Sequence, residues 1–385
     1  MVRTLTASTE NIDDFDAAIA DIKNGLDLEH KLLKNSVGII ACHYEFAESG
    51  ALKAICGALP FETCGTISSA QSTEKTTGIL CFSLMVLTSD TLSFKTASTP
   101  SLREKPNLLI EETYKTAAGG EKPAMIFTFA PFMVENSGDE YVNVLTRASG
   151  GVPVFGTLAV DDTADFHECF MLHNGNHYRD RMSLILVYGS FQPQFRMASI
   201  SPEKVLEQSA LITGSEGHIL KELNGRPVTD FFASMGLTKA SETAYAMTSL
   251  PFMVDYNDGT PPVSKVFISL NENGHAVCAG AMPEGSTLKI GVFNKDDVLL
   301  TTGRAVEEAL AAVPAPSGIL IYSCISRGMT LGSELLAEMD LVRNRTEGKI
   351  PLLHAYSGGE ICPTRINASS AVNRFHNNTF ILCIF

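Results

Sequence analysis

Two hydrophobic patterns alternate along most of the chain. Short uninterrupted apolar runs, such as residues 37–42 and 78–87, are typical of buried strands. In contrast, residues 11–24 place Ile12, Phe15, Ile19 and Ile22 at helical intervals, which predicts an amphipathic helix. The chain is therefore expected to alternate strands with helices.

The same two patterns, bounded by glycine, proline and asparagine turns, predict the remaining elements. Residues 92–99 are expected to form a hairpin with residues 78–87. Further helices are predicted over 48–57, 108–118, 138–149, 228–235, 299–313 and 331–345. Further strands are predicted over 60–69, 124–132, 152–160, 170–175, 182–188, 218–223, 263–270, 275–279, 288–293 and 352–356. Strands alternating with helices, with hairpins between them, indicate an α+β (mixed α/β) fold of mixed sheets covered by helices.

A polar stretch over residues 192–202 contains Pro193 and Pro202 and separates the apolar patterns of the two halves. We place a domain boundary there, which divides the chain into domains 1–195 and 196–385. Each domain is expected to contain a mixed sheet covered by helices.

Composition narrows the functional classes. Of the 385 residues, 45% are hydrophobic and 19% are charged, and the net charge is -14. Nucleic-acid backbones and anionic membranes both need a basic surface, so neither is an expected partner. The N-terminal residues lack the apolar core of a signal peptide, and no apolar run is long enough to span a membrane. A cytoplasmic location is expected.

The nine cysteines include no Cys-x-x-Cys pair, and most lie in apolar runs. We interpret them as buried, reduced thiols. The histidines show no metal-ligand spacing either, so no metal and no cofactor are predicted. Phosphate-binding glycine loops and the nucleophile elbow of hydrolases are also missing, which removes the usual reasons to propose an enzyme.

The most distinctive stretch is residues 353–364. A short strand breaks there into Ser357, Gly358 and Gly359, which permit close approach of the backbone, and Glu360 follows directly. One interpretation is a tight turn between core strands with a solvated glutamate. The other interpretation is a binding site for a small polar ligand.

Three motifs in one order resemble the C-terminal half of the FIST family. They are Ser323-Cys324-Ile325-Ser326-Arg327 after an apolar strand, Tyr356 to Pro363 with its Gly359-Glu360-Ile361 core, and Asn373 to Thr379 with His376-Asn377 near the end of the chain. More faintly, residues 152–162 resemble the family's N-terminal signature, although Leu158 and Ala159 stand where many members have a second glycine or serine.

This resemblance implies FIST N-type and C-type domains, and with them a sensory module that binds a small molecule such as an amino acid. Some members are linked to haem and nitric-oxide sensing, so a haem-based sensor is an alternative. The chain shows no output segment of its own. A separate partner such as a histidine kinase, cyclase or chemoreceptor is therefore expected.

Candidate site residues gather where strands are predicted to end. Asp161 and Asp162 could bind a cation, or could be a solvated strand end whose side chains face opposite ways. Cys324 could be packing or a nucleophile with a histidine as base, which leaves an enzyme as a second alternative. Arg327 is predicted to hold a ligand carboxylate, with Glu360 or Asp161 on an amine. The predicted ligand-binding set is Ser68, Ser69, Thr157, Asp161, Asp162, Cys324, Arg327, Ser357, Gly358, Gly359, Glu360, His376 and Asn377.

Overall fold

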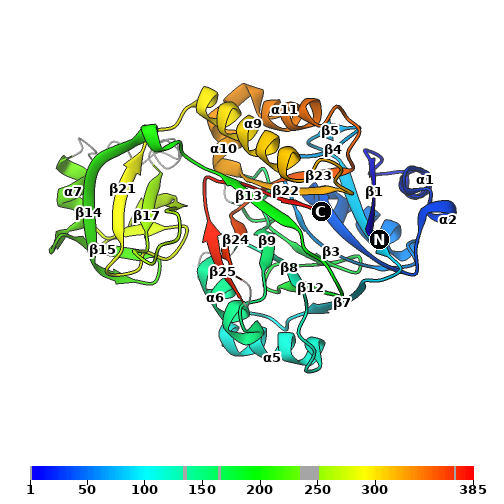
Figure 1. Cartoon of the computed structure of the whole chain (residues 1–385), viewed down its shortest axis with the longest axis horizontal. Helices are drawn as coiled ribbons and strands as arrows, with labels where there is room; N and C mark the ends of the chain where they lie inside the picture. The colour runs from blue at the N-terminus through cyan, green and yellow to red at the C-terminus, as the bar shows by residue number, and fades with distance from the viewer. Residues whose placement is uncertain (1, 133–136, 164–165, 235–250, 368–369) are drawn as a thin grey trace.

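The computed structural model describes residues 2–132, 137–163, 166–234, 251–367 and 370–385. It has a body of three six-stranded sheets and a smaller subdomain that stands apart from the body (Figure 1). The mixed α/β fold class predicted from the hydrophobic pattern is confirmed.

The body repeats one order of elements three times, and each time an outer strand and a helix precede two parallel strands. The first unit comprises β1 (Val2–Thr9), α1 (Phe15–Leu26), α2 (Leu28–Lys31), β2 (Asn35–Cys42), α3 (Tyr44–Glu48), α4 (Ala51–Gly57), β3 (Glu62–Ile67), β4 (Gln71–Thr73), β5 (Thr77–Gly78) and β6 (Phe82–Ser89). The second comprises β7 (Ser93–Ser98), α5 (Pro106–Ala118), β8 (Met125–Ala130), α6 (Gly138–Ser149), β9 (Val154–Leu158), β10 (Met171–His173), β11 (Asn176–Tyr178) and β12 (Ser183–Tyr188).

The third unit follows the same order but contains an insertion after its first strand. It comprises β13 (Gln194–Ala198), α9 (Lys295–Ala312), β22 (Ile319–Cys324), α10 (Ile325–Leu331), α11 (Ala337–Arg345), β23 (Leu352–Ser357), β24 (Glu360–Ile366), β25 (Ala371–His376) and β26 (Phe380–Ile384). The predicted boundary between residues 195 and 196 falls within β13, and the division into two domains stays a prediction.

Each body sheet has the same strand order and includes a hairpin from another unit. The three orders are β1-β6-β2-β3-β10-β11, β7-β12-β8-β9-β24-β25 and β13-β26-β22-β23-β4-β5. The pairs β2/β3, β8/β9 and β22/β23 are parallel. Because hairpins β4–β5, β10–β11 and β24–β25 each cross to a neighbouring sheet, no unit completes its own sheet.

The insertion forms the inserted subdomain, which has its own sheet and apolar core. Its elements are β14 (Val205–Glu216), β15 (Ile219–Leu223), β16 (Arg226–Pro227), α7 (Val228–Ser234), β17 (Phe252–Asp255), β18 (Val263–Lys265), β19 (Phe267–Leu270), β20 (Ala276–Cys278) and β21 (Thr287–Gly291).

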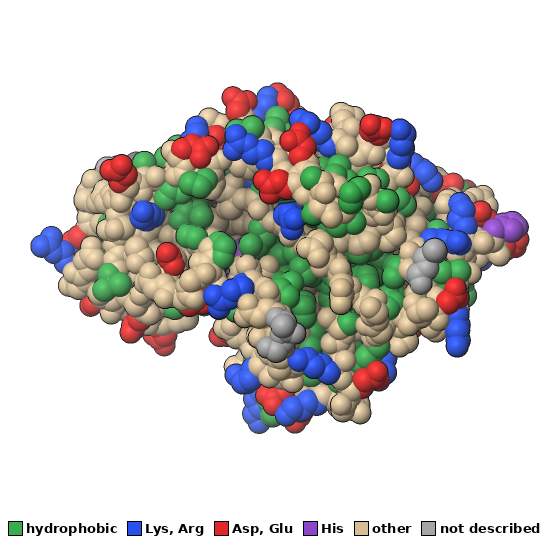
Figure 2. Space-filling model, in the orientation of Figure 1, with side chains coloured by type: hydrophobic (Ala, Val, Ile, Leu, Met, Phe, Trp, Pro, Cys, Tyr) green, Lys and Arg blue, Asp and Glu red, His purple; other side chains and the backbone are tan. Residues whose placement is uncertain are grey.

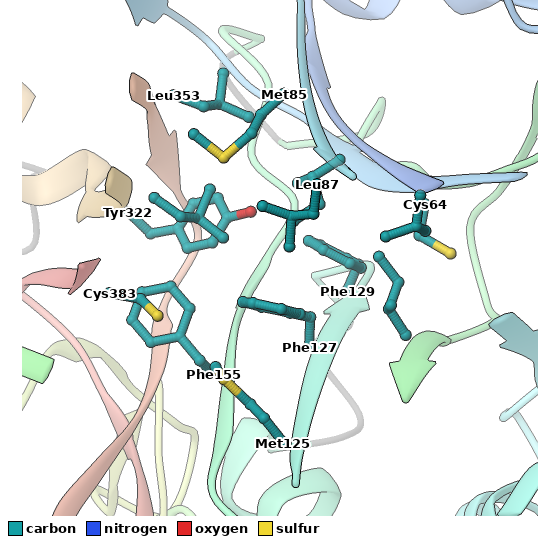
Figure 3. Packing of buried hydrophobic residues seen from close by; sticks show 14 of the residues in the cluster. Cys64, Met85, Leu87, Met125, Phe127, Phe129, Phe155, Tyr322, Leu353 and Cys383 are labelled. Atoms are coloured by element: carbon teal, nitrogen blue, oxygen red, sulfur yellow. The ribbon is translucent and has the colours of Figure 1, made fainter. Parts of the chain in front are cut away.

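The main core lies where the inner faces of the three body sheets meet. Figure 3 shows Leu87, Phe127, Phe155, Tyr322 and Leu353 converging there from strands of all three sheets. Separate apolar clusters lie between the outer sheet faces and the helices that cover them. Burial of both faces explains why the central strands are continuous apolar runs rather than alternating ones.

Several sequence-based predictions need correction. Residues 92–99 do not pair with residues 78–87, because β6 already lies between β1 and β2 and has no free edge. Strand β7 instead pairs with β12 in another sheet. Strand β1 was not predicted, since its three threonines, Arg3 and Ser8 make the segment only weakly apolar. The predicted helix over 331–345 is interrupted at Gly332, whose φ of 60° ends α10.

The molecular surface is mixed in character. Figure 2 shows charged side chains of both signs spread over the visible face, with apolar side chains exposed in the middle. In the part of the chain that the structure describes, no helix is both long and apolar enough to cross a membrane.

Gly156 tests the close parallel pairing at the centre of the second sheet. A Cβ at this position would overlap the carbonyl oxygen of Thr128 on β8. Gly156→Ala is therefore expected to lower the free energy of unfolding by about 1–3 kcal/mol, measured by urea denaturation. The matched control is Gly57→Ala, where a Cβ meets no atom within 4 Å. Equal stability of the two variants would contradict the close packing.

Candidate functional site

The ends of several body strands lie side by side. Cys324, at the end of β22, is opposite Ser357 at the end of β23. Thr157 on β9 is opposite Glu360, the first residue of β24. The Ser68 hydroxyl donates to the carbonyl oxygen of Tyr356 at 2.9 Å. The structure thus brings together segments around Ser68, Thr157, Cys324 and Ser357 that lie far apart in the sequence.

The glycine turn between β23 and β24 is held closely by its neighbours. The Gly358 N–H donates to the Leu158 carbonyl oxygen at 2.9 Å, and the Leu158 N–H donates to the Gly359 carbonyl oxygen at 2.9 Å. Gly359 has a φ of 146°, and a Cβ there would collide with the Phe375 ring. Glycine is therefore required for both conformation and space.

Glu360 is fully buried rather than solvated. The Ser357 hydroxyl donates to its Oε1, while its Oε2 has no hydrogen-bond partner among the described residues. Burial raises the pKa of the Glu360 carboxyl well above its usual value of 4.5, although Ser357 and Arg327 oppose the shift. The shift favours the protonated, uncharged form of this side chain.

Arg327 has a protein partner, which the motif alone did not reveal. Its Nε and Nη2 donate to Glu338 on α11 at 3.0 and 2.8 Å, and both side chains are fully buried. Glu338 also accepts hydrogen bonds from Thr302 at 2.5 Å and from Ser323 at 2.6 Å. Burial is the largest single influence and opposes ionisation of Glu338, but attraction to Arg327, together with the smaller effects of His354, Ser323 and Thr302, outweighs it and lowers the pKa of Glu338. The Nη1 of Arg327 has no partner in the described chain.

Residues 376–378 connect the strand ends around Glu360 and Arg327 to the inserted subdomain. The Asn377 N–H donates to the Ser264 carbonyl oxygen of β18 at 3.0 Å. The Ser326 hydroxyl donates to Asn378 Oδ1 at 3.0 Å. His376 lies opposite Glu360 in the β24–β25 ladder, so the two side chains share a face. We call the contact between β18 and residues 375–378 the seam.

A buried ion pair also spans the seam. Lys265 of β18 is completely buried and donates to Asp139 Oδ1 and Oδ2 at 3.0 and 2.8 Å. It also donates to the Phe375 carbonyl oxygen at 2.8 Å. The Ala281 N–H supplies Asp139 with a further hydrogen bond of 2.7 Å. These contacts join β18, α6 and β25, which belong to different parts of the chain.

Five buried polar atoms around the seam have no hydrogen-bond partner among the described residues. They are Glu360 Oε2, His376 Nε2, Asn377 Oδ1, Asn378 Nδ2 and the Ser264 hydroxyl. All five side chains belong to residues that are at most 3% exposed. Leaving a buried donor or acceptor unpaired costs about 1–3 kcal/mol, so this concentration needs an explanation.

The two predicted acids have different surroundings. Asp161 is buried and accepts hydrogen bonds from the Thr163 N–H and hydroxyl at 2.8 and 2.7 Å, so it organises its own loop. Asp162 has a side chain that is 45% exposed and lies 3.3 Å from His43. One acid is thus enclosed by its own loop and the other is partly exposed. Contact of either acid with a ligand stays a prediction, as it does for Ser69, whose buried hydroxyl has no partner among the described residues.

The cysteines are all free and buried, as their sequence contexts predicted. Burial, reinforced by Glu360, raises the pKa of Cys324 to about 12. Burial lowers the pKa of His354 to about 4 and that of His376 to about 3. At neutral pH the thiol is therefore protonated and both imidazoles are neutral. Among the described residues, no group of three or more histidine, cysteine or acidic side chains is arranged to hold a metal.

Sequence reasoning missed Glu338, Asp139, Lys265 and Asn378. The sequence did contain a signal for Lys265, which is a charged residue between Val263 and Phe267 within a predicted strand. Such a position indicates a buried charge that needs a partner. The sequence also contained a signal for Glu338. This residue lies four positions before Val342, on the buried face of the same helix. Neither signal identifies the partner, which comes from a distant segment in the case of Lys265.

A sizeable cavity lies elsewhere on the protein. It is a surface groove of about 640 Å³ lined by residues that include Pro153, Phe195 and Arg365. None of the predicted site residues lines it.

Comparison with known proteins identifies the family. The FIST N domain matches residues 36–226, and the FIST C domain matches residues 230–363. The chain therefore belongs to the FIST family, whose domains form sensory modules of signal transduction. The N-domain match extends beyond residue 195 into the inserted subdomain.

Solved structures give only weak likenesses. A cyanuric acid hydrolase from A. caulinodans is 10% identical with a TM-score of 0.38, over 100% of this chain and 99% of that chain. Phosphoribosylformylglycinamidine synthase II from Thermotoga maritima is 10% identical with a TM-score of 0.21, over 100% of this chain and 72% of that chain. At these values neither likeness bears on the fold or the function. The search of curated proteins found no match.

The Arg327–Glu338 pair is expected to be a major contributor to stability. Glu338→Gln leaves the guanidinium charge buried without an opposite charge, which should lower the free energy of unfolding by about 3–5 kcal/mol. Glu307→Gln is the matched control, because it removes the exposed pair with Arg345 and should cost less than about 1 kcal/mol. Urea denaturation of both variants measures the difference, and similar costs would contradict a structural role for the buried pair.

The raised pKa of Glu360 predicts a specific pH dependence of stability. The unfolded chain releases the proton above about pH 4.5, while the folded chain keeps it, so this contribution to stability is full below pH 4.5 and falls as the pH rises. As the pH rises above about 4.5, the wild type should lose stability relative to Glu360→Gln, by at most about 1.4 kcal/mol per pH unit. Parallel urea titrations measure this difference, and identical pH slopes would show that Glu360 is ionised in the folded protein.

Proposed function

We propose that this protein is a cytoplasmic sensor that binds a small polar ligand at the seam and signals to a separate partner. The observation that carries the proposal is the group of five unpartnered polar atoms from Ser264, Glu360, His376, Asn377 and Asn378. A ligand that hydrogen-bonds to these atoms would remove several desolvation penalties at once. The free energy recovered in this way would contribute to the affinity for the ligand.

The position of the seam supports a sensory role. Ser264 belongs to the inserted subdomain, whereas Glu360 and residues 376–378 belong to the body. A ligand that contacts both the inserted subdomain and the body would stabilise one arrangement of the two relative to each other. Such a shift in arrangement is a common way for ligand binding to be signalled. The seam residues are buried, so entry of a ligand requires the two parts to separate. A histidine kinase, cyclase or chemoreceptor remains the proposed type of partner.

An α-amino acid was the ligand expected from the sequence, with its carboxylate on Arg327. The geometry favours a different role for that arginine, because Glu338 already neutralises its charge. A ligand carboxylate would either displace Glu338 and leave that buried carboxylate unpaired, at a cost of about 3–5 kcal/mol, or bind Nη1 and add a second negative charge beside one guanidinium. Arg327 then acts by positioning Glu338 and β22 beside the site.

The alternatives fit the described side chains less well. An enzyme based on Cys324 needs a thiolate, but burial keeps that thiol protonated. A haem group needs an axial side chain facing an open pocket, whereas His354, His376 and Cys324 are all enclosed. These residues do not fit haem, and binding of an organic ligand is the function that we propose.

The test is retention of a small molecule by the intact protein. Wild type, Asn377→Leu and the surface control Glu307→Gln are incubated with a cellular small-molecule fraction, separated by gel filtration and analysed by mass spectrometry. We expect one compound to remain with the wild type and the control, and binding to be at least about tenfold weaker in Asn377→Leu because an unpartnered carbonyl is lost. Circular dichroism and unfolding curves establish that the variant is folded. Absence of a retained compound, or equal retention by a folded Asn377→Leu, would contradict the proposal.

A further inference from the structure

The formal charges around the seam are already paired within the protein. Lys265 is neutralised by Asp139, and Arg327 by Glu338, with all four side chains at most 8% exposed. Arg374, two residues before His376 in the sequence, is paired with Asp258 and stacks on the Tyr256 ring at 4.2 Å. A charged ligand would therefore bring an unmatched charge into a buried region, which is strongly unfavourable.

The unpartnered atoms are of a different kind. Asn378 Nδ2 is a donor and Asn377 Oδ1 is an acceptor, while the Ser264 hydroxyl can be either. His376 Nε2 is either a donor or an acceptor, depending on the tautomer. Arg327 adds Nη1, a donor left over after its charge is matched by Glu338. The set thus offers both donors and acceptors.

We infer that the ligand at the seam is an uncharged compound carrying amide-type groups, in which N–H donors and carbonyl acceptors occur together. An amide N–H fits the Asn377 carbonyl, and an amide carbonyl fits the Asn378 amino group. Primary amides, cyclic imides and lactams satisfy this requirement, whereas zwitterions, carboxylates and amines do not. This inference rests on the proposed function, because it specifies the ligand of the same site.

Glu360 is also suited to bind an amide group. Its Oε1 accepts a hydrogen bond from the Ser357 hydroxyl, while its Oε2 has no hydrogen-bond partner among the described residues. A protonated carboxyl group offers a donor and an acceptor, as an amide does, so it can pair with an amide without separating charge. Ionised glutamate could only accept.

Four alanine derivatives test the inference because they vary charge on one skeleton. L-alanine is zwitterionic, L-alaninamide is cationic, N-acetyl-L-alaninate is anionic and N-acetyl-L-alaninamide is uncharged. Succinimide and succinate form a second uncharged and charged pair. Each probe is added at millimolar concentration to wild type, Asn377→Leu and Glu307→Gln, and the melting temperature and the binding isotherm are measured.

We expect N-acetyl-L-alaninamide or succinimide to raise the melting temperature of the wild type and of Glu307→Gln, and to bind at least about tenfold more weakly to Asn377→Leu. If only charged probes bind, and Asn377→Leu weakens them, the ligand class is wrong while the proposed site stands. If an uncharged probe binds equally well to a folded Asn377→Leu, the assignment to this site is wrong. No response to any probe would contradict both the ligand class and the site.

Discussion

Exchange of hairpins among the three body sheets is the constraint on which the rest of the structure depends. Because β3, β9 and β23 each lie next to a hairpin that belongs to another unit, no unit can form its sheet alone. The exchange also brings the turn before each hairpin close to its neighbours, as the bonds between Leu158 and the turn at Gly358 and Gly359 show. Packing of the sheets therefore determines which polar residues meet at the strand ends.

The polar groups brought together this way fall into two kinds. Arg327 with Glu338, and Lys265 with Asp139, are fully buried pairs whose charges cancel. Asn377, Asn378, Ser264 and Glu360 keep atoms without partners among the described residues. Since a folded chain normally pairs its buried polar groups, we infer that the paired kind maintains the architecture, and we propose that a ligand acts at the unpaired kind around the seam.

Much of the fold could be predicted from the chain because its signals are local. Helix α6 matched its prediction over Gly138–Ser149, where glycines and a serine cap bound a clear apolar face. The pairing of β7 could not be predicted, since it depends on which sheet edge is free. For the site, the glycine turn and Glu360 had local signals, but the partner of Arg327 did not. The burial that raises the pKa of Glu360 arises only when β9, β22 and β25 surround it.

Hydrogen exchange of the protein with and without its retained compound tests the central claim most directly. Backbone amides of β18 and of residues 375–379 report on opening of the seam, and those of β14 and β15 serve as an internal reference within the inserted subdomain. If the ligand binds at the seam, protection should increase at β18 and residues 375–379 and be absent from the variant Asn377→Leu. Protection confined to another surface, or no change at the seam on saturation, would contradict the account.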